Sequence, residues 1–189
     1  YLEQIYNRYE VDNLCLKSIM FSTEANLISK IIPSTYLIFI IRDPKDIISS
    51  MLNISKKQIK MGLKPNYPRD MKALCTFVNN HYDYILSSKN IKNNPNIILI
   101  KYENLILNTL DVLNGIIKKL SLKHIYDDEG TLWTNAHKMS NPAINPYHSE
   151  LWYQKPTSKK INSYKNELTK EEINFINNSC LDLIKKFNY

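Results

Sequence analysis

The sequence predicts an α/β fold in three layers, a parallel sheet flanked by helices. Two short runs rich in Ile and Leu, 36–41 and 96–101, have the length and composition of buried strands. Segments with helical periodicity follow each run, as expected for consecutive βαβ units. With 189 residues the chain is long enough to bury a core of its own, and we expect a single domain over residues 1–189.

The first predicted elements precede and include the first buried strand. Residues 13–17 are predicted to form a short strand. Ser22 is a good N-cap for a helix that continues to about Lys30 and ends before Pro33. The run from Tyr36 to Ile41 is apolar at every position, which is typical of a central strand with both faces covered.

A helix is predicted to begin where that strand ends. Asp43 can cap this helix through its carboxylate, Pro44 suits the first helical position, and we expect the helix to reach about Asn53. Ligands of parallel α/β sheets bind beyond the carboxyl ends of the strands. Arg42 and Tyr102 each stand at such an end, so both are candidate binding residues.

Three further helices and one long irregular segment complete the prediction. One helix is expected over about 69–87 and an amphipathic one over about 103–120. The last begins at Thr169, and Glu172 three residues later completes a capping box. Residues 125–163 lack clear periodicity and contain three prolines. A loop of this length in a small domain is usually functional or disordered.

The net charge of +7 has two interpretations. It can reflect a Lys-rich, solvated surface, or a partner or cofactor that carries phosphate or sulfate. Because the lysines are spread along the chain, a nucleic-acid partner is not favoured. No apolar run approaches the roughly 18 residues that span a bilayer. We therefore expect no membrane segment in this chain. As a separate expectation, we assign a cytoplasmic location.

The three cysteines, Cys15, Cys75 and Cys180, are odd in number, far apart and set among apolar residues. This pattern predicts buried thiols rather than a disulfide framework or a metal site, and we expect no metal.

The element from Arg42 to Ser50 is the strongest candidate binding motif. An Arg at a strand end that leads directly into a capped helix places a guanidinium beside free backbone N–H groups, which attract anions. The Ser50 side chain is expected to lean back along the helix toward Arg42, which would complete a phosphate clamp. The alternative is a structural Arg–Asp pair, with Ser50 tolerated in a helix.

The run from Phe39 to Met51, with Arg-Asp-Pro-Lys-Asp at 42–46, resembles the 3′-phosphate-binding motif of sulfotransferases that use 3′-phosphoadenosine 5′-phosphosulfate (PAPS). In that family the strand ends in Arg-Asp-Pro-Arg/Lys-Asp, and a Ser follows eight residues after the Arg. Ser50 meets that spacing. The resemblance implies a P-loop-like sulfotransferase fold, PAPS as sulfuryl donor, and contacts of Arg42 and Ser50 with its 3′-phosphate.

Other segments resemble the same family in the same order. They are Ile100–Leu105, similar to a core strand that runs into Tyr-Glu-Asp-Leu; Leu120–Leu122; Tyr164–Thr169, similar to Trp-Arg/Lys-Asn-Glu-Leu-Thr; and Phe187–Tyr189, similar to a terminal Phe-Gly-Tyr. By this resemblance Tyr102 contacts the adenosine, unless it is only a packed aromatic residue. Likewise Lys159 and Lys160 close over the 3′-phosphate, unless they are a solvated pair.

One part of the family's pattern is missing from this sequence. The family's 5′-phosphosulfate loop is Pro-x-x-Gly-Thr-x-Trp after a strand. The only similar stretch, Gly130 to Trp133, follows three acidic residues that would repel the ligand. Because the family's loop precedes the Arg-Asp-Pro strand, we expect the chain to be the C-terminal portion of a truncated sulfotransferase domain.

The general base is not assigned by the resemblance. Lys17-Ser18-Ile19 stands where cytosolic members have Lys-Thr-His, so Ile19 replaces the basic His of that subgroup. Lys17 is the candidate catalytic residue, as a stabiliser of charge on the transferring group, or else a structural lysine at a strand end. His137 and His148 lie in the irregular segment and are further candidates to face the acceptor.

These observations predict transfer of the sulfuryl group of PAPS to a hydroxyl or amine acceptor. The acceptor is expected to be a small molecule, with a carbohydrate slightly favoured over a phenol. A second hypothesis is a non-catalytic protein that keeps the 3′-phosphate site and binds nucleotides or polyanions. A third, a small P-loop kinase, would need a Gly-x-x-x-x-Gly-Lys-Ser/Thr loop, and the sequence has none.

Overall fold

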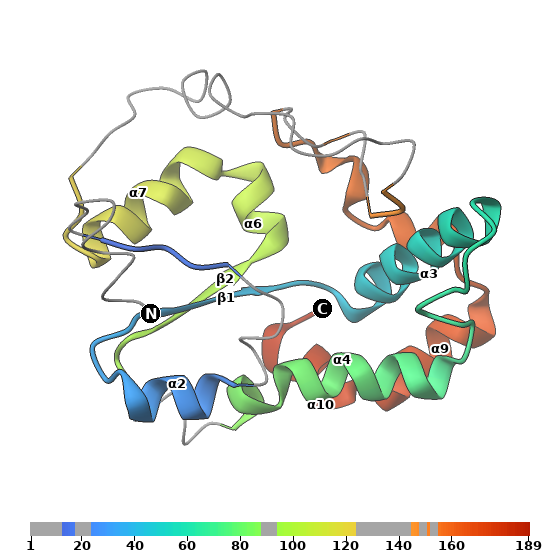
Figure 1. Ribbon diagram of the computed structural model, residues 1–189, viewed down its shortest axis with the longest axis horizontal. Coiled ribbons are helices and arrows are strands. Elements are labelled where there is room, and N and C mark those ends of the chain that lie inside the picture. The colour runs from blue at the N-terminus through green and yellow to red at the C-terminus, as the bar shows by residue number, and fades with distance from the viewer. Residues whose placement is uncertain (1–12, 18–23, 88–93, 124–144, 148–150, 152–154) are drawn as a thin grey trace.

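The computed structural model describes residues 13–17, 24–87, 94–123, 145–147, 151 and 155–189 (Figure 1). At its centre lie two parallel strands, β1 (Leu37–Ile41) and β2 (Ile97–Lys101). Leu37 is opposite Ile97 and Ile41 is opposite Lys101, so both strands end at the same edge. Both predicted strands are confirmed to within one residue, and so is their parallel pairing. Within the described residues these two strands make up the sheet, and a wider sheet stays a prediction.

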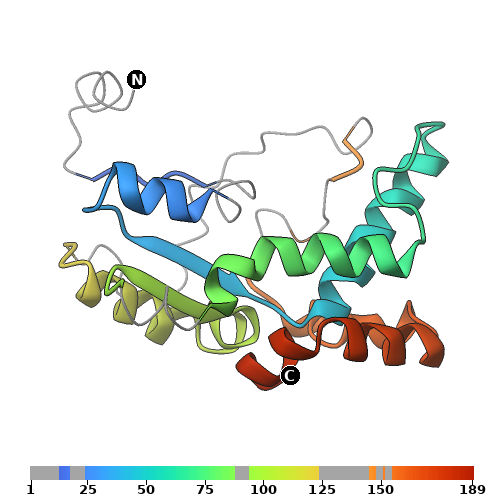
Figure 2. The same ribbon diagram turned by 90° about the horizontal axis from the view of Figure 1, so that it is seen from below.

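Helices lie on both sides of the strand pair (Figures 1 and 2). On one side are α6 (Tyr102–Leu107) and α7 (Thr109–Lys119), and on the other is α2 (Ala25–Ile31). The side of β1 that faces α2 is fully apolar and buried. It joins a core cluster whose buried members are Ala25, Leu37, Phe39, Ile41, Ile85 and Ile97.

The opposite side of β1 is only partly covered in the described part of the chain. Ile38 and Ile40 are 41% and 50% exposed, whereas Ile98 and Ile100 beside them on β2 are buried. The helices on this side, which begin directly after β2, therefore cover β2 better than β1. The prediction that β1 is covered on both faces is wrong for these residues.

Helix α3 (Pro44–Lys60) begins as predicted but ends later. The carboxylate of Asp43 accepts the backbone N–H of Lys45 across 2.9 Å, and Pro44 is the first helical residue. The helix continues about two turns beyond Asn53, the predicted end. The polar side chains of Ser55 and Gln58 are buried in this part of the helix. Each is satisfied there because it accepts a hydrogen bond from a backbone N–H of the connection that follows α3, at residues 67 and 66 respectively. Polar residues on a buried face conceal this part of the helix from a periodicity argument.

Two more helices, α4 (Met71–Leu86) and α9 (Lys170–Ser179), pack against α3, and α10 (Leu181–Phe187) packs against α4 and α9. They enclose a second core cluster whose buried members are Ile48, Met51, Leu52, Leu74, Cys75, Val78, Leu168, Ile176, Cys180 and Leu183. The predicted helix over 69–87 is confirmed to within two residues at either end. The capping box is confirmed, since Thr169 and Glu172 each accept the other's backbone N–H.

The predicted helix over 103–120 is interrupted at Asn108, between α6 and α7, where φ is −132° and ψ is 49°. Two side chains compete with the helical pattern there. Thr109 donates to the carbonyl of Leu105, and Asn108 donates to the side chain of Asn104. Short polar side chains of this kind commonly interrupt helices by bonding locally.

Three predictions near the start of the chain need correction or concern residues outside the described part of the structure. Residues 13–17 form no strand, and Cys15 is exposed rather than buried. Cys75 and Cys180 are buried, as predicted. Ser22 lies outside the described residues, and α2 follows Glu24, whose side chain makes no cap hydrogen bond.

In the described part of the chain no helix is long and apolar enough to cross a membrane.

Candidate functional site

Three segments that are distant in sequence meet at Arg42, where β1 turns into α3. The guanidinium carbon of Arg42 lies 4.4 Å from the centre of the Tyr102 ring, at the β2–α6 junction. Its Nη2 donates a hydrogen bond of 2.6 Å to the carbonyl of Lys160, the last residue of the short helix η2 (Ser158–Lys160). The same Nη2 lies 3.9 Å from a carboxylate oxygen of Asp46. Both predicted strand-end residues, Arg42 and Tyr102, thus lie together.

The guanidinium of Arg42 has N–H donors in addition to the Nη2 group that is bonded to the Lys160 carbonyl. A guanidinium carries five N–H groups in a planar fork that suits two oxygens of one anion. The Arg42 side chain is 18% exposed, and its Nε is buried without a hydrogen-bond partner among the described residues. A buried donor without a partner is costly, so an oxygen ligand at this point would be stabilised.

The start of α3 differs from the expectation of free backbone N–H groups. The N–H of Lys45 is bonded to the Asp43 carboxylate, and the N–H of Asp43 is bonded to Oε1 of Glu103 across 3.4 Å. Burial raises the pKa of the Asp43 carboxyl, and Lys45, whose Nζ lies 3.2 Å away, opposes this shift. Carboxylates therefore already occupy these two backbone N–H donors, and the Arg42 side chain is left as the candidate anion-binding group.

Ser50 lies in the second turn of α3 with an exposed side chain. It lies six positions after Pro44, which corresponds to about 9 Å along a helix axis. Its hydroxyl is accessible to a ligand. The joint contact of Ser50 and Arg42 with one phosphate stays a prediction.

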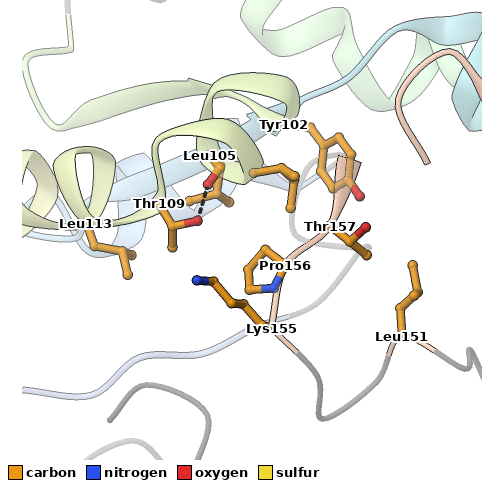
Figure 3. A pocket seen from close by; sticks show the side chains of 9 residues that line it. Tyr102, Leu105, Thr109, Leu113, Leu151, Lys155, Pro156 and Thr157 are labelled. Atoms are coloured by element: carbon orange, nitrogen blue, oxygen red, sulfur yellow. Dashed lines mark hydrogen bonds between the residues drawn. The ribbon is translucent and has the colours of Figure 1, made fainter. Parts of the chain in front are cut away.

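A pocket of about 370 Å³ opens beside Tyr102 (Figure 3). Its apolar side comes from α6 and α7, and its other side comes from the segment before η2. Lining residues are Tyr102, Leu105, Ile106, Thr109, Leu113, Leu151, Lys155, Pro156 and Thr157. An apolar pocket with a few polar groups at its edge, at the carboxyl end of parallel strands, is typical of a nucleotide-binding site.

The predicted lysines differ in their relation to this site. Lys159 and Lys160 are exposed in η2, and the Lys160 carbonyl joins that helix to Arg42. The structure therefore brings the irregular segment to Arg42, although through a backbone oxygen rather than an ammonium group. Lys17 is exposed in the segment 13–17, outside any strand. His137, His148 and the stretch from Gly130 to Trp133 lie outside the described residues.

Sequence reasoning missed the distant bonding partners of three residues that organise this site. Asp46 accepts hydrogen bonds from residues 162–164, and Glu103 and Tyr189 are bonded to each other. Asp46 lies one helical turn after Arg42, and that spacing was the one available signal. No pattern in the sequence relates Tyr189 to Glu103.

These features define an α/β protein with a partly buried arginine and an adjoining apolar pocket at its strand ends. A family model described as "Sulfotransferase family" matches residues 1–128, which include Arg42, Ser50 and Tyr102. This chain belongs to the sulfotransferase family. No curated protein and no solved structure matches it.

Proposed function

We propose that this protein transfers the sulfuryl group of PAPS to a hydroxyl or amine acceptor. The observation that carries the proposal is the position of Arg42, which lies at the end of β1 and stacks on Tyr102. Its buried Nε has no hydrogen-bond partner in the described part of the chain. A doubly anionic phosphate would supply the oxygen acceptors that this guanidinium lacks.

The described residues fit the nucleotide half of PAPS. Arg42 and the exposed hydroxyl of Ser50 would hold the 3′-phosphate, and the adjoining pocket has room for a nucleoside. Tyr102 would contact the adenosine from the pocket wall. The ammonium groups of Lys159 and Lys160 would add positive charge from the solvent side, since both residues are exposed in η2.

The reaction exchanges one bond at sulfur for another. The acceptor oxygen or nitrogen bonds to sulfur, the bond between sulfur and the bridging oxygen breaks, and its electron pair leaves on the 5′-phosphate. The proton of the acceptor passes to a base. The residues assigned here bind and orient the donor, which makes the attack effectively unimolecular. Lys17 remains the proposed stabiliser of charge on the transferring group.

The proposed acceptor is a small molecule, with a carbohydrate slightly favoured. Ile19 stands where cytosolic members of the family carry a basic His, so the phenol-sulfating arrangement is not supported. We propose no nucleic-acid partner, because the lysines are not gathered into one block.

The decisive experiment compares the product nucleotide, 3′-phosphoadenosine 5′-phosphate, with AMP in a calorimetric titration. The two ligands differ only in the 3′-phosphate. We expect the bisphosphate to bind at least about tenfold more tightly, the lower end for charged hydrogen bonds. Equal affinities would overturn the proposal.

Transfer itself is tested with radiolabelled PAPS and a panel of sugar, phenol and amine acceptors. Label in an acceptor product supports an enzyme. Selective binding of the bisphosphate without transfer to any acceptor would instead support the alternative, a non-catalytic nucleotide- or polyanion-binding protein on the same fold.

A further inference from the structure

Asp46 binds a turn that lies more than a hundred residues away in the sequence. Its carboxylate is 1% exposed and accepts three hydrogen bonds from residues 162–164. The donors are the backbone N–H of Asn162 at 2.8 Å, the hydroxyl of Ser163 at 3.2 Å and the backbone N–H of Tyr164 at 3.0 Å. We propose that Asp46 is a positioning residue for the 3′-phosphate site, an inference that rests on the proposed function.

The turn has a conformation that lets its amides converge on one carboxylate. Asn162 has φ +59° and ψ 20°, in the left-handed region. Asn tolerates this region better than most residues, and Gly tolerates it best. The Asn162 side chain is itself exposed, so the residue contributes through its backbone. The N–H groups of Asn162 and Tyr164, with the Ser163 hydroxyl between them in sequence, form a site for one anionic group, and the Asp46 carboxylate occupies it.

Arg42, just before α3, and Asp46, in the first turn of α3, both bond to the same distant segment of the chain. Arg42 donates a hydrogen bond to the Lys160 carbonyl, while Asp46 accepts hydrogen bonds from backbone N–H groups of residues 162 and 164. The two side chains are one helical turn apart and lie 3.9 Å from each other. The path of the turn therefore fixes where the Lys160 carbonyl meets the guanidinium, and so determines the direction of the remaining Arg42 donors. Asp46 acts on the phosphate through Arg42, without touching it.

The first test is Asp46→Asn, which keeps the size of the side chain but replaces one acceptor with an NH₂ group facing backbone donors. We expect hydrogen exchange at the amides of Asn162 and Tyr164 to become roughly 10- to 100-fold faster in the ligand-free protein, as the loss of charged hydrogen bonds implies. Asp182→Asn, at an exposed first-turn carboxylate of α10, is the matched control. Unchanged exchange in Asp46→Asn would overturn the inference.

The same variant also separates positioning from general destabilisation. If Asp46 sets Arg42, Asp46→Asn lowers affinity for 3′-phosphoadenosine 5′-phosphate roughly tenfold or more and leaves AMP affinity unchanged. An equal loss for both nucleotides would indicate a merely structural role and overturn the inference. Lack of preference for the bisphosphate in the natural chain would overturn the proposed function, and this inference with it.

A second pair of variants leaves the buried carboxylate intact, in case Asp46→Asn does not fold. Asn162→Ala introduces a residue that is strained at positive φ, whereas Asn162→Gly relieves the strain. We expect Asn162→Ala to reduce the preference for the bisphosphate over AMP severalfold and Asn162→Gly to retain it. Equal preferences in the two variants would show that the turn does not position the site, and would overturn the inference.

Discussion

Tyr189 donates a hydrogen bond to Oε2 of Glu103 across 2.8 Å, and the other carboxylate oxygen of Glu103 accepts the backbone N–H of Asp43. The Tyr189 hydroxyl also lies 3.0 Å from the carbonyl oxygen of Ile41. Glu103 thus connects the turn that carries Arg42 to a residue far along the chain. The ends of both strands are held in place by this connection.

Tyr189→Phe should destabilise the protein by about 1–3 kcal/mol, the cost of leaving partly buried acceptors unsatisfied. Urea denaturation measures this change in the free energy of unfolding. Tyr36→Phe, at a tyrosine that is 43% exposed, is the control and should change stability little. Equal stabilities of the two variants would contradict a role for the Tyr189 hydroxyl.

Arg42→Lys should weaken binding of 3′-phosphoadenosine 5′-phosphate by roughly 10- to 100-fold while AMP affinity stays nearly constant. Lysine keeps the charge but loses the planar fork that can grip two oxygens. Calorimetric titration of both nucleotides measures the effect. Arg69→Lys is the matched control, because Arg69 is exposed and paired with Glu172 and Glu167. A similar loss in Arg69→Lys would contradict a specific role for Arg42.

Tyr102→Ala should weaken binding of the bisphosphate and of AMP alike, by roughly 3- to 30-fold. The variant removes a pocket wall and a cation–π contact that is worth about 0.5–2 kcal/mol. Tyr102→Phe keeps the ring and should bind both nucleotides within about twofold of the natural chain. If Tyr102→Ala affects only the bisphosphate, the pocket does not hold the adenosine.

Thr169→Ala should lower the free energy of unfolding by about 0.5–2 kcal/mol, the usual cost of losing an N-cap. Thr169 accepts the N–H of Glu172 at the start of α9, which packs on α4 in the second core cluster. Thermal or urea unfolding measures the loss. Thr76→Ala, at an exposed threonine inside α4, provides the control without a cap. Nucleotide affinity below the unfolding transition should not change.

Stability should fall between about pH 10 and pH 12. Burial raises the pKa of Tyr82 to about 12, and burial together with the Glu103 carboxylate raises the pKa of Tyr189. Above pH 10 the unfolded chain loses phenolic protons that the folded protein retains. The free energy of unfolding therefore decreases with pH, by at most about 1.4 kcal/mol per pH unit for each tyrosine.

Urea denaturation across this pH range measures the slope. Tyr82→Phe removes one of the two groups and should make the decrease shallower. A Tyr82→Phe slope equal to that of the natural chain would show that Tyr82 does not keep its proton on folding.

Local patterns in the sequence predicted the elements whose signals are local. Both strands, the cap at Asp43 and the capping box at Thr169 follow from apolar runs and capping chemistry within a few residues, and the structure confirms them. The resemblance at residues 42–46 indicated the sulfotransferase family, which the family model shows. The two strand patterns also placed Arg42 and Tyr102 each at the carboxyl end of a strand, and the structure has both residues there.

Tertiary structure decided the features that depend on distant partners. The two extra turns of α3 carry buried Ser55 and Gln58, whose acceptors are satisfied by the connection after the helix, and no periodicity reveals this. The bonds from Asp46 to the turn at Asn162 and from Tyr189 to Glu103 join residues more than 80 positions apart. In water a carboxylate is already hydrogen-bonded to solvent. It therefore fixes the position of a distant segment only when folding buries it among the donors of that segment.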